Sequence, residues 1–395
     1  MQTLILSDVY FPRVNGVSTS IQTITRELRA LGDTVFTIAP DYPGAAPEPG
    51  LIRIASHRVP FDPEDRRMRY GDTVAAGERI ENTLIDLIHI QTPFIAHYAG
   101  LELGRRRGLP VIATYHTLFG EYLHHYVRML PRPLAKAVAR HASRRQCNQL
   151  DAVIVPTSPI RDLLRGYGVR APIHVLPTGI GQDWLAGGDG AAFRSRHGIE
   201  PGRPVLLFVG RVAHEKNIDF LLAVTRRVRQ SHPDVLLVIA GEGPALASLR
   251  ESAGRMGVAS SVRFVGNLDR EGELRDCFRA ADVFVFASRT ETQGLVLLEA
   301  MARGVPVVSI AEMGSRDVLR EGHGCLIAPL DEVGFTDRVL AVLGDEALRG
   351  RLAAAAVEWA RQWSAPELAL RLQGIYRAVL RARGGAGALS GAETG

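Results

Sequence analysis

The feature that most constrains the fold of this chain is a rhythm of short apolar runs that alternate with longer helical patterns. The first runs are TLILSD and DTVFTIAP. Between them, VSTSIQTITRELRAL carries four aliphatic residues at helical spacing before Gly32: Ile21, Ile24, Leu28 and Leu31. Further buried strands are expected at LIDLIHI, PVIATYH, DAVIVPT and HVLPT. This order of strands and helices predicts a parallel sheet covered by helices.

The rhythm restarts after LAGGDGAAFRSRHGIEPGRP, a Gly-rich and charged stretch that begins at Leu185 and is typical of a domain connection. The second series has strands at PVLLFVGR, DVLLVIAG, VRFVGN, DVFVFAS and PVVSI, with helices over 220–228 and 246–256. A chain of 395 residues is too long for one ordinary core. We therefore expect two similar α/β domains, 1–180 and 181–362. The small and polar stretch 384–395 is expected to be a disordered tail.

Composition is that of a soluble globular protein, with 46% hydrophobic and 23% charged residues. The start, MQTLILSDVY, reads as a buried strand, because it lacks the basic start and long apolar run of a signal peptide. No apolar run approaches the roughly 20 residues that span a bilayer. Three distant cysteines, Cys147, Cys277 and Cys325, indicate a reducing compartment and neither a disulfide framework nor a zinc site. A net charge of +5 permits an acidic partner, whether nucleotide phosphate, anionic membrane or nucleic acid.

Ligands of open α/β sheets bind beyond the carboxyl ends of the strands, so the loops after strands are the candidate sites. Neither a GxGxxG fingerprint nor a GxxxxGK[ST] phosphate loop occurs, which argues against dehydrogenases and P-loop enzymes. In YFPRVNGVSTS, the Asn15-Gly16 turn leads into a helix near Ser18 and outlines an anion site. An ordinary strand-to-helix turn is the alternative for this loop.

Four further loops carry polar or glycine residues just past buried strands. His116 ends PVIATYH, just past a buried strand, and is either a ligand contact or a satisfied structural histidine. GRVAHEKN sets Arg211 and Lys216 around one turn, where two cations suit a diphosphate, although a solvated charged loop is the alternative. The glycines of GEGP, residues 241–244, either admit a ligand close to the backbone or only shape a turn. The loop VGNLD, residues 265–269, also follows a strand.

The segment TETQGLVLLEAMARG places Glu291 in a loop and Glu299 inside a helix that begins near Gly294. A fully helical segment would separate the two carboxylates by about 12 Å. The paired carboxylates of glycoside hydrolases lie only about 5–9.5 Å apart. The two glutamates therefore resemble two contacts to separate parts of one elongated ligand, with a helix N-terminus between them that suits phosphate. The alternatives are a buried structural role for Glu299 and solvent exposure for Glu291.

Taken together, Glu291-x7-Glu299, GRVAHEKN, the NGV turn and His116 resemble the retaining glycosyltransferases of family 4, from about Leu4 to Val307. The resemblance implies the GT-B fold: two Rossmann-like domains facing across a cleft, with a C-terminal helix over 363–383 that returns to the N-terminal domain. It implies an N-terminal acceptor domain and a C-terminal domain for the nucleotide sugar. It implies no metal cofactor, because cations and the helix N-terminus neutralise the leaving diphosphate.

The resemblance also implies a role for each matching residue. Gly16 would lie beneath the diphosphate, and His116 would contact the transferred sugar near its reacting face. Arg211 and Lys216 would bind the diphosphate and stabilise the leaving group. Glu291 would hold sugar hydroxyls and Glu299 the ribose. The remaining contacts would come from the base-side residues Asn267 and Leu268 and from the turn at the helix start, Gln293, Gly294 and Leu295.

One departure narrows the resemblance. Many members carry Phe where this chain has Gln293, and the variant TETQG, with TPFIAHYAG, ATYHTLFGEYLHHY and MGSRD, is similar to the lipid-glycosylating branch, notably the diacylglycerol 3-α-glucosyltransferases. Related mannosyl- and glucuronosyltransferases look much alike. The resemblance thus implies a hexose, with UDP-glucose as the expected donor and diacylglycerol as the expected acceptor. Phosphoinositide, polyprenyl and soluble sugar acceptors stay open, and the oligomeric state is not indicated.

The segment 122–150 supports a membrane partner because it contains no Asp or Glu. A basic amphipathic helix is typical of a membrane-surface element, and each cation contributes about 1 kcal/mol at an anionic leaflet. Leu130, Leu134 and Val138 lie on another face of this helix. We expect a cytoplasmic enzyme held peripherally at the inner face of the cell membrane, with a solvated helix as the alternative and nucleic-acid binding disfavoured. The basic residues are Arg128, Arg132, Lys136, Arg140, Arg144 and Arg145.

Overall fold

The computed structural model describes residues 1–59, 62–81, 85–116, 132–270 and 272–390. The chain forms two compact units. Unit 1 comprises Met1–Gly179 and Ala365–Gly395, and unit 2 comprises Ile180–Ser364. The chain therefore leaves unit 1 once and returns to it once. The sequence places the two crossings after residues 180 and 362, and the structure places them after residues 179 and 364.

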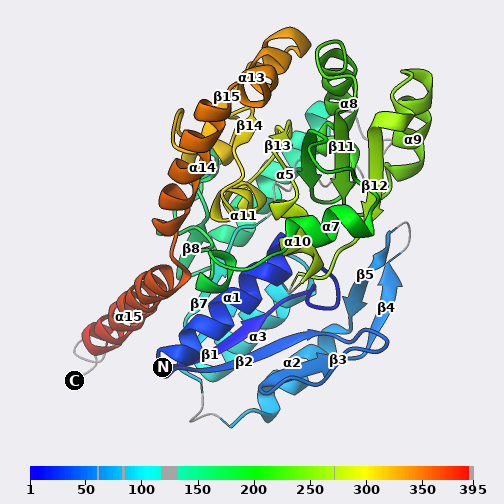
Figure 1. Cartoon of the computed structure of the whole chain (residues 1–395). Helices are drawn as coiled ribbons and strands as arrows, with labels where there is room; N and C mark the ends of the chain where they lie inside the picture. Colours follow the sequence, from blue (N-terminus) through cyan, green and yellow to red (C-terminus); the bar gives the residue numbers. More distant parts are fainter. Residues whose placement is uncertain (60–61, 82–84, 117–131, 271, 391–395) are drawn as a thin grey trace. The chain divides into compact units, whose positions relative to one another are not determined.

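Unit 1 is built on a seven-stranded parallel sheet in the order β3-β2-β1-β6-β7-β8-β9 (Figure 1). Leu4, Ile5 and Leu6 of the central strand β1 are fully buried, which explains the unbroken apolar run near the start of the sequence. The sequence analysis did not anticipate β3, nor the separate antiparallel pair β4 and β5. The strands are β1 (Gln2–Leu6), β2 (Thr34–Pro40), β3 (Leu51–Ile54), β4 (Ser56–Val59), β5 (Asp62–Met68), β6 (Leu87–Ile90), β7 (Val111–Thr114), β8 (Ala152–Val155) and β9 (Ile173–Val175).

Helix α1 (Gly16–Ala30) forms where the apolar spacing predicts it. The side chain of Asn15 caps the helix by accepting a hydrogen bond from the Ser18 amide at 2.8 Å. Ile21 and Leu28 are fully buried, and Gly32 ends the helix with a φ of 85°, which suits glycine. Further helices of unit 1 are α2 (Tyr70–Arg79), α3 (Ile95–Arg107), α5 (Arg132–Cys147), α6 (Ser158–Gly166) and α15 (Ala365–Ser390).

The C-terminal helix α15 packs beside α1 within unit 1 (Figure 1). Tyr376 is fully buried with its hydroxyl 2.7 Å from Nδ1 of His89, and Gln373 donates to Asp33 at 2.9 Å. The prediction of a disordered tail from residue 384 is wrong for residues 384–390, which continue α15. Extending an existing helix needs no new nucleation, so small residues can follow it. Residues 391–395 lie outside the described residues.

Unit 2 repeats the architecture with a six-stranded parallel sheet in the order β12-β11-β10-β13-β14-β15. Its strands are β10 (Val205–Val209), β11 (Leu236–Ala240), β12 (Val262–Gly266), β13 (Val283–Phe286), β14 (Val307–Ser309) and β15 (Cys325–Ile327). The first five coincide with predicted strands, and β15 was not predicted. The α-helices are α7 (Gly190–Arg196), α8 (Ile218–Val228), α9 (Leu246–Arg255), α10 (Glu273–Arg279), α11 (Leu295–Ala302), α12 (Ser315–Val318), α13 (Glu332–Gly344) and α14 (Glu346–Arg361).

The Gly-rich stretch from Leu185 is not the domain connection that its composition indicates. It lies inside unit 2 and contains helix α7. A side chain at Gly190 would place its Cβ 2.4 Å from the carbonyl oxygen of Arg279, at the end of α10. The glycine there allows two helices to pack closely, so its composition reflects packing and not a flexible linker.

In the part of the chain that the structure describes, no helix is long and apolar enough to cross a membrane. Cys147, Cys277 and Cys325 are all free thiols buried in the core.

Candidate functional site

The sheet of unit 2 has a position where the strand order reverses, between β10 and β13. From there the sheet continues through β11 and β12 on one side and through β14 and β15 on the other. The loops after β10 and β13 diverge at such a point and leave a crevice at the carboxyl edge of the sheet. These two loops are GRVAHEKN and SRTETQG, the two that carry the predicted cations and Glu291.

Lys216 and Glu291 meet at this crevice. The Nζ of Lys216 lies 2.5 Å from Oε1 of Glu291, and the two side chains are 20% and 13% exposed. The alternative of solvent exposure for Glu291 is therefore wrong. Burial alone would raise the pKa of Glu291, but the charge and hydrogen bond of Lys216 outweigh burial, and the pKa lies below its ordinary value. The pair is thus a charged group held in place at the centre of the crevice.

Hydrogen bonds to backbone carbonyls fix the positions of these two loops. Asn217 adopts a left-handed φ of 56°, and its side-chain amide donates to the carbonyl oxygen of Ala287 at 3.4 Å. The backbone carbonyl of Glu291 accepts a hydrogen bond from Gly314 at 2.8 Å. A Cβ on Gly314 would lie 1.9 Å from the carbonyl oxygen of Thr292, so only glycine fits there. These contacts place Lys216 and Glu291 before any ligand arrives.

Arg211 lies partly buried in the same loop as Lys216. The loop is supported by GEGP, because the backbone amide of Val212 donates to the carbonyl of Glu242 at 2.8 Å. A Cβ on Gly241 would lie 2.0 Å from the carbonyl oxygen of Gly210. Of the two alternatives for the GEGP glycines, the structure supports turn packing, with the loop acting as a base for the loop that carries Arg211.

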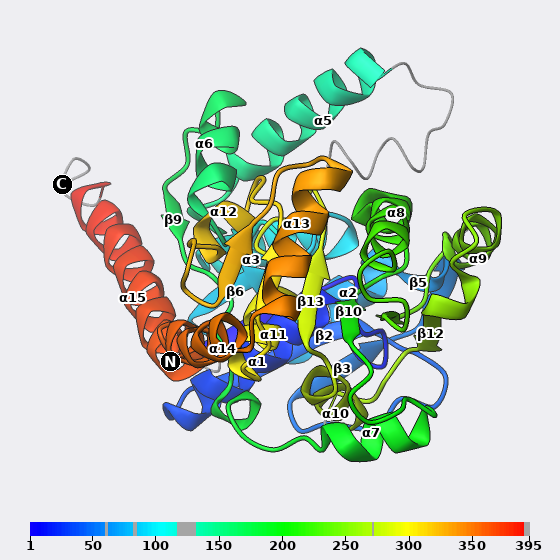
Figure 2. The ribbon, with the colours of Figure 1, turned by 45° about the horizontal axis from the view of Figure 1, so that its top comes forward.

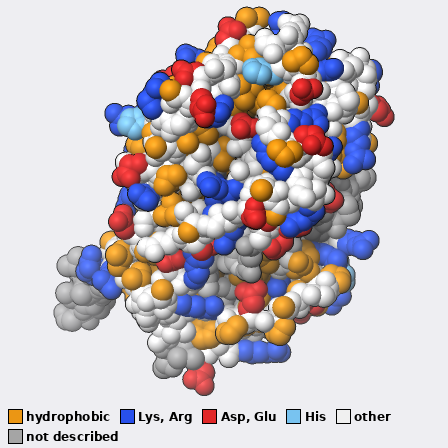
Figure 3. All heavy atoms as spheres, viewed as in Figure 1, with side chains coloured by type: hydrophobic (Ala, Val, Ile, Leu, Met, Phe, Trp, Pro, Cys, Tyr) orange, Lys and Arg blue, Asp and Glu red, His pale blue; other side chains and the backbone are white. Residues whose placement is uncertain are grey.

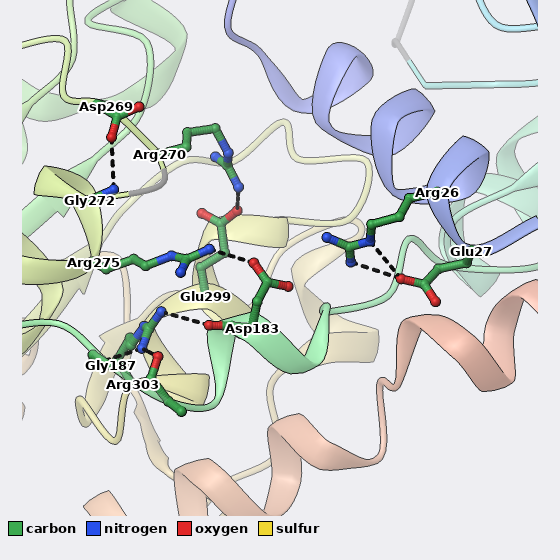
Figure 4. Close-up of polar contacts among 11 residues, drawn as sticks. Arg26, Glu27, Asp183, Gly187, Asp269, Arg270, Gly272, Arg275, Glu299 and Arg303 are labelled. Carbon is green, nitrogen blue, oxygen red and sulfur yellow. Dashed lines mark hydrogen bonds and ion pairs between the residues drawn. The ribbon is translucent and has the colours of Figure 1, made fainter. Parts of the chain in front are cut away.

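Glu299 lies in α11 and is 4% exposed, as the alternative of a buried glutamate requires. Its Oε1 lies 2.5 Å from a guanidinium nitrogen of Arg270, a residue of the loop after β12 (Figure 4). The sequence analysis did not single out Arg270. The position of the arginine directly after VGNLD was the available signal. The two glutamates of TETQGLVLLEAMARG thus each have a basic partner in the structure: Lys216 for Glu291 and Arg270 for Glu299.

An aromatic ring organises the cations around Glu299. The guanidinium carbons of Arg270, Arg275 and Arg303 lie 5.0, 5.6 and 5.3 Å from the ring centre of Trp184. Arg275 also pairs with Asp183 at 2.5 Å, and Arg303 donates to the backbone of the same segment, as Figure 4 shows. Burial lowers the pKa of Arg303 to about 10. The cluster fixes the edge of unit 2 beside Glu299.

The start of α11 matches the predicted phosphate site in form. Gly294 stands at the N-cap with a left-handed φ of 83° and provides no side-chain cap. The amide of Leu297 donates to the Gly294 carbonyl at 2.9 Å, so the amides of Leu295 and Val296 are the ones that suit an anion. Gln293 beside it is 6% exposed. In the loop after β12, the side-chain nitrogen of Asn267 lies 3.5 Å from a carboxylate oxygen of Glu242, and Leu268 packs against the core of unit 2.

In unit 1 the order of strands reverses between β1 and β6. Gly16 begins α1 after β1, and a Cβ there would meet nothing within 4 Å among the described neighbours. Gly16 is also absent from the positions with a left-handed φ. Neither packing nor backbone geometry of unit 1 therefore requires a glycine here, while Asn15 caps the helix, so the anion site and the ordinary turn both stay open.

His116 is held by a residue that the sequence analysis missed. Its Nε2 lies 2.7 Å from Oε1 of Gln91, the residue that directly follows β6. Burial lowers the pKa of His116 to about 4, so the imidazole is neutral at pH 7. A neutral ring can exchange hydrogen bonds with an uncharged hydroxyl in either direction. His116 is thus oriented by a hydrogen bond, in agreement with both the ligand and the structural alternatives.

Asp8 occupies the reversal point itself. Its carboxylate accepts a hydrogen bond from the Thr92 hydroxyl at 2.7 Å and from the Ala96 amide in the first turn of α3 at 3.2 Å. Burial raises the pKa of Asp8 to about 6 and outweighs these hydrogen bonds. Asp8 is a second residue that sequence reasoning missed, although its place directly after a buried strand was a usable signal.

Helix α5 lies beside α6 at the rim of unit 1 (Figure 2). It buries a face of small residues, Ala139, Ser143 and Cys147, and exposes Leu134 and Val138 at 50% and 43%. Arg140, Arg144 and Arg145 are exposed as predicted. Arg132 and Lys136 belong to the helix but their side chains are not described, and Arg128 lies outside the described residues.

Comparison with known proteins places both units in one group of enzymes. Residues 14–184 match the family "Glycosyltransferase Family 4", and residues 190–359 match "Glycosyl transferases group 1". An alpha-monoglucosyldiacylglycerol synthase of Streptococcus pneumoniae is 36% identical over 78% of this chain and 71% of its own length. A GDP-mannose-dependent alpha-mannosyltransferase of Mycobacterium tuberculosis is 29% identical over 96% of this chain and 97% of its own length.

Among solved structures, the sucrose-phosphate synthase of Thermosynechococcus elongatus superposes with a TM-score of 0.78 and 21% identity. The match covers 97% of this chain and 100% of the other. The fold class predicted from the sequence, a GT-B fold with two Rossmann-like domains, is thereby confirmed. The resemblance to the lipid-glycosylating branch is likewise confirmed by the synthase of Streptococcus pneumoniae.

Proposed function

Since the chain belongs to the family 4 glycosyltransferases, we propose that it transfers glucose from UDP-glucose to diacylglycerol in glycolipid synthesis. The transfer proceeds with retention at the anomeric carbon and without a metal ion. The enzyme works in the cytoplasm, bound peripherally at the inner face of the cell membrane. The nearest alternative is the same transfer with a mannosyl or glucuronosyl donor, or onto a phosphoinositide, polyprenyl or soluble sugar acceptor.

The observation that carries the sugar-transfer proposal is the Lys216–Glu291 pair at the crevice of unit 2. A nucleoside diphosphate leaves with additional negative charge, which is best met by donors already in position. Lys216 and Arg211 would supply positive charge to the diphosphate, and the free amides at the start of α11 would supply further donors. Glu291, fixed by Lys216, would accept hydrogen bonds from hydroxyls of the sugar.

The ribose is the proposed ligand of Glu299. A buried carboxylate that is oriented by Arg270 can accept hydrogen bonds from two neighbouring hydroxyls. Asn267 and Leu268 would lie by the base, and Gln293, Gly294 and Leu295 would line the turn over the phosphates. Gly16 and His116 are the contributions proposed from unit 1: one gives room for the diphosphate, and the other contacts the transferred sugar.

Two observations support a lipid acceptor. The relative that is 36% identical carries a diacylglycerol-glycosylating name. Helix α5 exposes aliphatic and basic side chains side by side, as a helix lying on an anionic membrane does. Mannosyl transfer is the second candidate, because the mannosyltransferase relative is matched over nearly the whole of both chains.

Nucleic-acid binding finds little support. In the view of Figure 3, Lys and Arg side chains lie interspersed with Asp and Glu and do not form one continuous basic surface on that face. Many arginines are also engaged in ion pairs, such as Arg106 with Glu78 and Glu102. A nucleic-acid site would additionally leave the paired glutamates unexplained.

The test is a matrix of nucleotide sugars against acceptors. UDP-glucose, GDP-mannose and UDP-glucuronate are each incubated with diacylglycerol, phosphatidylinositol, polyprenyl phosphate and soluble sugars, and each product is analysed for its anomeric configuration. We expect glucose on diacylglycerol with the α configuration, at a rate that EDTA does not change. Transfer to none of these acceptors would contradict the proposal, and strict dependence on a divalent ion would contradict its mechanism.

A further inference from the structure

A small hollow lies in unit 1 next to His116, at the carboxyl ends of β6 and β7. Its cavity volume is about 30 Å³, and one water needs roughly 10–15 Å³ by this measure. The hollow therefore has room for two waters, or for the two heavy atoms of a hydroxymethyl group. Residues that line it include Gln91, Thr92, His97, Tyr115, His116 and Gln146.

Two polar atoms of the lining lack hydrogen-bond partners in the described part of the chain. They are Nε2 of Gln91 and Nε2 of His97, and the two residues are 1% and 2% exposed. Burying a polar group without a partner costs about 1–3 kcal/mol, so each such group in a native protein needs an explanation. Both residues line the same cavity, so a ligand or water there is the candidate source of the missing hydrogen bonds.

The two atoms differ in what they require. The amide nitrogen of Gln91 can only donate, while Oε1 of the same side chain is engaged with His116. His97 interacts with the side chain of Gln149. Because Nε2 has no partner, this contact uses Nδ1. Burial lowers the pKa of His97 to about 4, so the ring is neutral and can present an acceptor lone pair at Nε2.

One donor and one acceptor are the pair that a hydroxyl satisfies, because its oxygen accepts one hydrogen bond and its proton is donated in another. We infer that this hollow receives an alcohol hydroxyl of the acceptor substrate, held between Gln91 and His97. The inference rests on the proposed function and names its acceptor subsite. The shared chemistry is a primary alcohol, which the glycerol of a lipid and the hydroxymethyl group of a soluble sugar both provide.

The walls favour this ligand over a charged one. Ile90, Ala113, Leu150 and Val153 contribute apolar surface, and the described lining holds no Lys, Arg, Asp or Glu. A phosphate or carboxylate would be desolvated there without a counter-charge. The position also suits the reaction, since Gln91 links the hollow directly to His116, the residue expected to contact the transferred sugar.

The test compares two variants of His97. His97→Asn keeps a side-chain amide near the position of Nδ1 but removes the atom at Nε2, whereas His97→Gln restores a polar atom near Nε2. We expect the KM for diacylglycerol, presented in phosphatidylglycerol vesicles, to rise about tenfold in His97→Asn, as fits the loss of one buried hydrogen bond, and to recover in His97→Gln. The KM for the nucleotide sugar should not change in either variant.

The second readout is hydrolysis of the nucleotide sugar in the absence of an acceptor. In both His97 variants this hydrolysis should proceed at the wild-type rate. Tyr376→Phe is the matched control, because it removes a buried hydrogen bond to His89 in the same unit without touching the hollow lining. A parallel series with glycerol and glucose as acceptors separates a lipid from a soluble source of the hydroxyl.

The outcomes separate the two proposals. Wild-type enzyme that transfers sugar to no alcohol at all contradicts the proposed function. Wild-type transfer with an unchanged acceptor KM in His97→Asn overturns the hollow as the acceptor subsite and assigns it to structural water. A rise in KM that Tyr376→Phe reproduces also overturns it, because the effect would then reflect stability alone.

Discussion

In both units, loops that follow the parallel strands meet at the carboxyl edge of the sheet. The side chains that join these loops differ in charge between the two units. In unit 2 the loops meet through full charges, Lys216 with Glu291 and Arg270 with Glu299. In unit 1, apart from the carboxylate of Asp8, they meet through neutral groups, of which the part-buried pair of His116 and Gln91 is the central example. The same fold has thus been given one edge that suits an ionic ligand and one that suits an uncharged ligand.

This difference follows from the cost of burying charge. A diphosphate brings its own charge, so the cations that bind it must be kept ionised, and carboxylate partners achieve this while the site is empty. A hydroxyl brings no charge, so neutral side chains suffice, and ions would be costly there. The proposed assignment of the donor to unit 2 and of the acceptor to unit 1 agrees with the electrostatics of each unit considered by itself.

The largest expected effect comes from breaking the ion pair in unit 2. Lys216→Ala should lower kcat for sugar transfer by about a hundredfold to a thousandfold, the usual loss for one preorganised donor to a developing charge. Glu291→Ala should be similarly impaired. The measurement is steady-state transfer by purified protein whose circular dichroism matches the wild type.

The matched control is Arg227→Ala, which breaks the Arg227–Glu332 pair at 2.9 Å in the same unit but at the far end of α8. It should retain nearly full activity. Full activity in Lys216→Ala or Glu291→Ala would contradict the placement of the site.

The second prediction concerns the stability of the charged edge. Arg270→Ala leaves Glu299 buried without its partner and should lower the free energy of unfolding of unit 2 by roughly 3–5 kcal/mol. Replacing both residues, in Arg270→Ala/Glu299→Gln, should recover part of that loss, because no buried charge remains. The measurement is urea unfolding followed by tryptophan fluorescence. All three tryptophans, Trp184, Trp359 and Trp363, belong to unit 2 and report on it alone. A double variant no more stable than the single one would refute the ion-pair argument.

The third prediction uses pH to separate the two units. Burial lowers the pKa of His89 to about 3 and the pKa values of His97 and His116 to about 4, all below the unfolded value of 6.5. The unfolded chain therefore binds more protons below pH 6.5. The free energy of unfolding of unit 1 falls by about 2 kcal/mol per histidine between pH 7.5 and pH 5. Asp8 acts in the opposite sense, because its pKa of about 6 lies above the unfolded value of 3.8. Its protonation raises the free energy of unfolding by about 1 kcal/mol over the same range. With three such histidines, the net loss for unit 1 is about 5 kcal/mol.

Unit 2 should respond much less over the same range. The pKa of Glu291 lies below its ordinary value of 4.5, so the stability it contributes is lost only below that pH. The pKa of the half-buried His197 is also lowered and acts in the same sense as the buried histidines, but less strongly. Circular dichroism of the whole chain should therefore show a larger shift at pH 5 than tryptophan fluorescence does. Equal losses of stability by circular dichroism and by tryptophan fluorescence would contradict the proposed difference between the units.

The smallest effect concerns α5. Replacing Arg140 and Arg144 with Gln should weaken binding to phosphatidylglycerol vesicles by about thirtyfold, at about 1 kcal/mol per cation. Binding is measured by vesicle sedimentation at fixed ionic strength. The control is the same change at Arg105 and Arg106 of α3, which already pair with Glu102. Equal losses in both variants would point to net charge and not to α5.

The sequence predicted the repeated architecture because each buried strand leaves an uninterrupted apolar run. Residues 205–209 are an example, with every position of β10 buried. It also located Lys216 and Glu291, since both lie in the loops that follow such strands. Nothing in the local pattern indicated that Lys216 would pair with Glu291, because that contact joins loops 75 residues apart and depends on the order of strands in the sheet.

Arg270 and Gln91 escaped notice for a related reason. Each is a single polar residue in a short loop, and its importance appears only when the fold brings it to Glu299 or His116. The misread stretch from Leu185 shows the converse error. Its glycines had the composition of a linker but serve close helix packing, which composition cannot distinguish from flexibility.

The return of α15 to unit 1 has a consequence for how this protein is made. Residues 180–364 are contiguous, so unit 2 has its whole sequence as soon as Ser364 leaves the ribosome. Unit 1 must wait for Gln373 and Tyr376, the partners of Asp33 and His89. The half of the protein that is translated first is therefore the half that is completed last, and during synthesis its sheet edge and the unfilled place of α15 are exposed to chaperones and to other nascent chains.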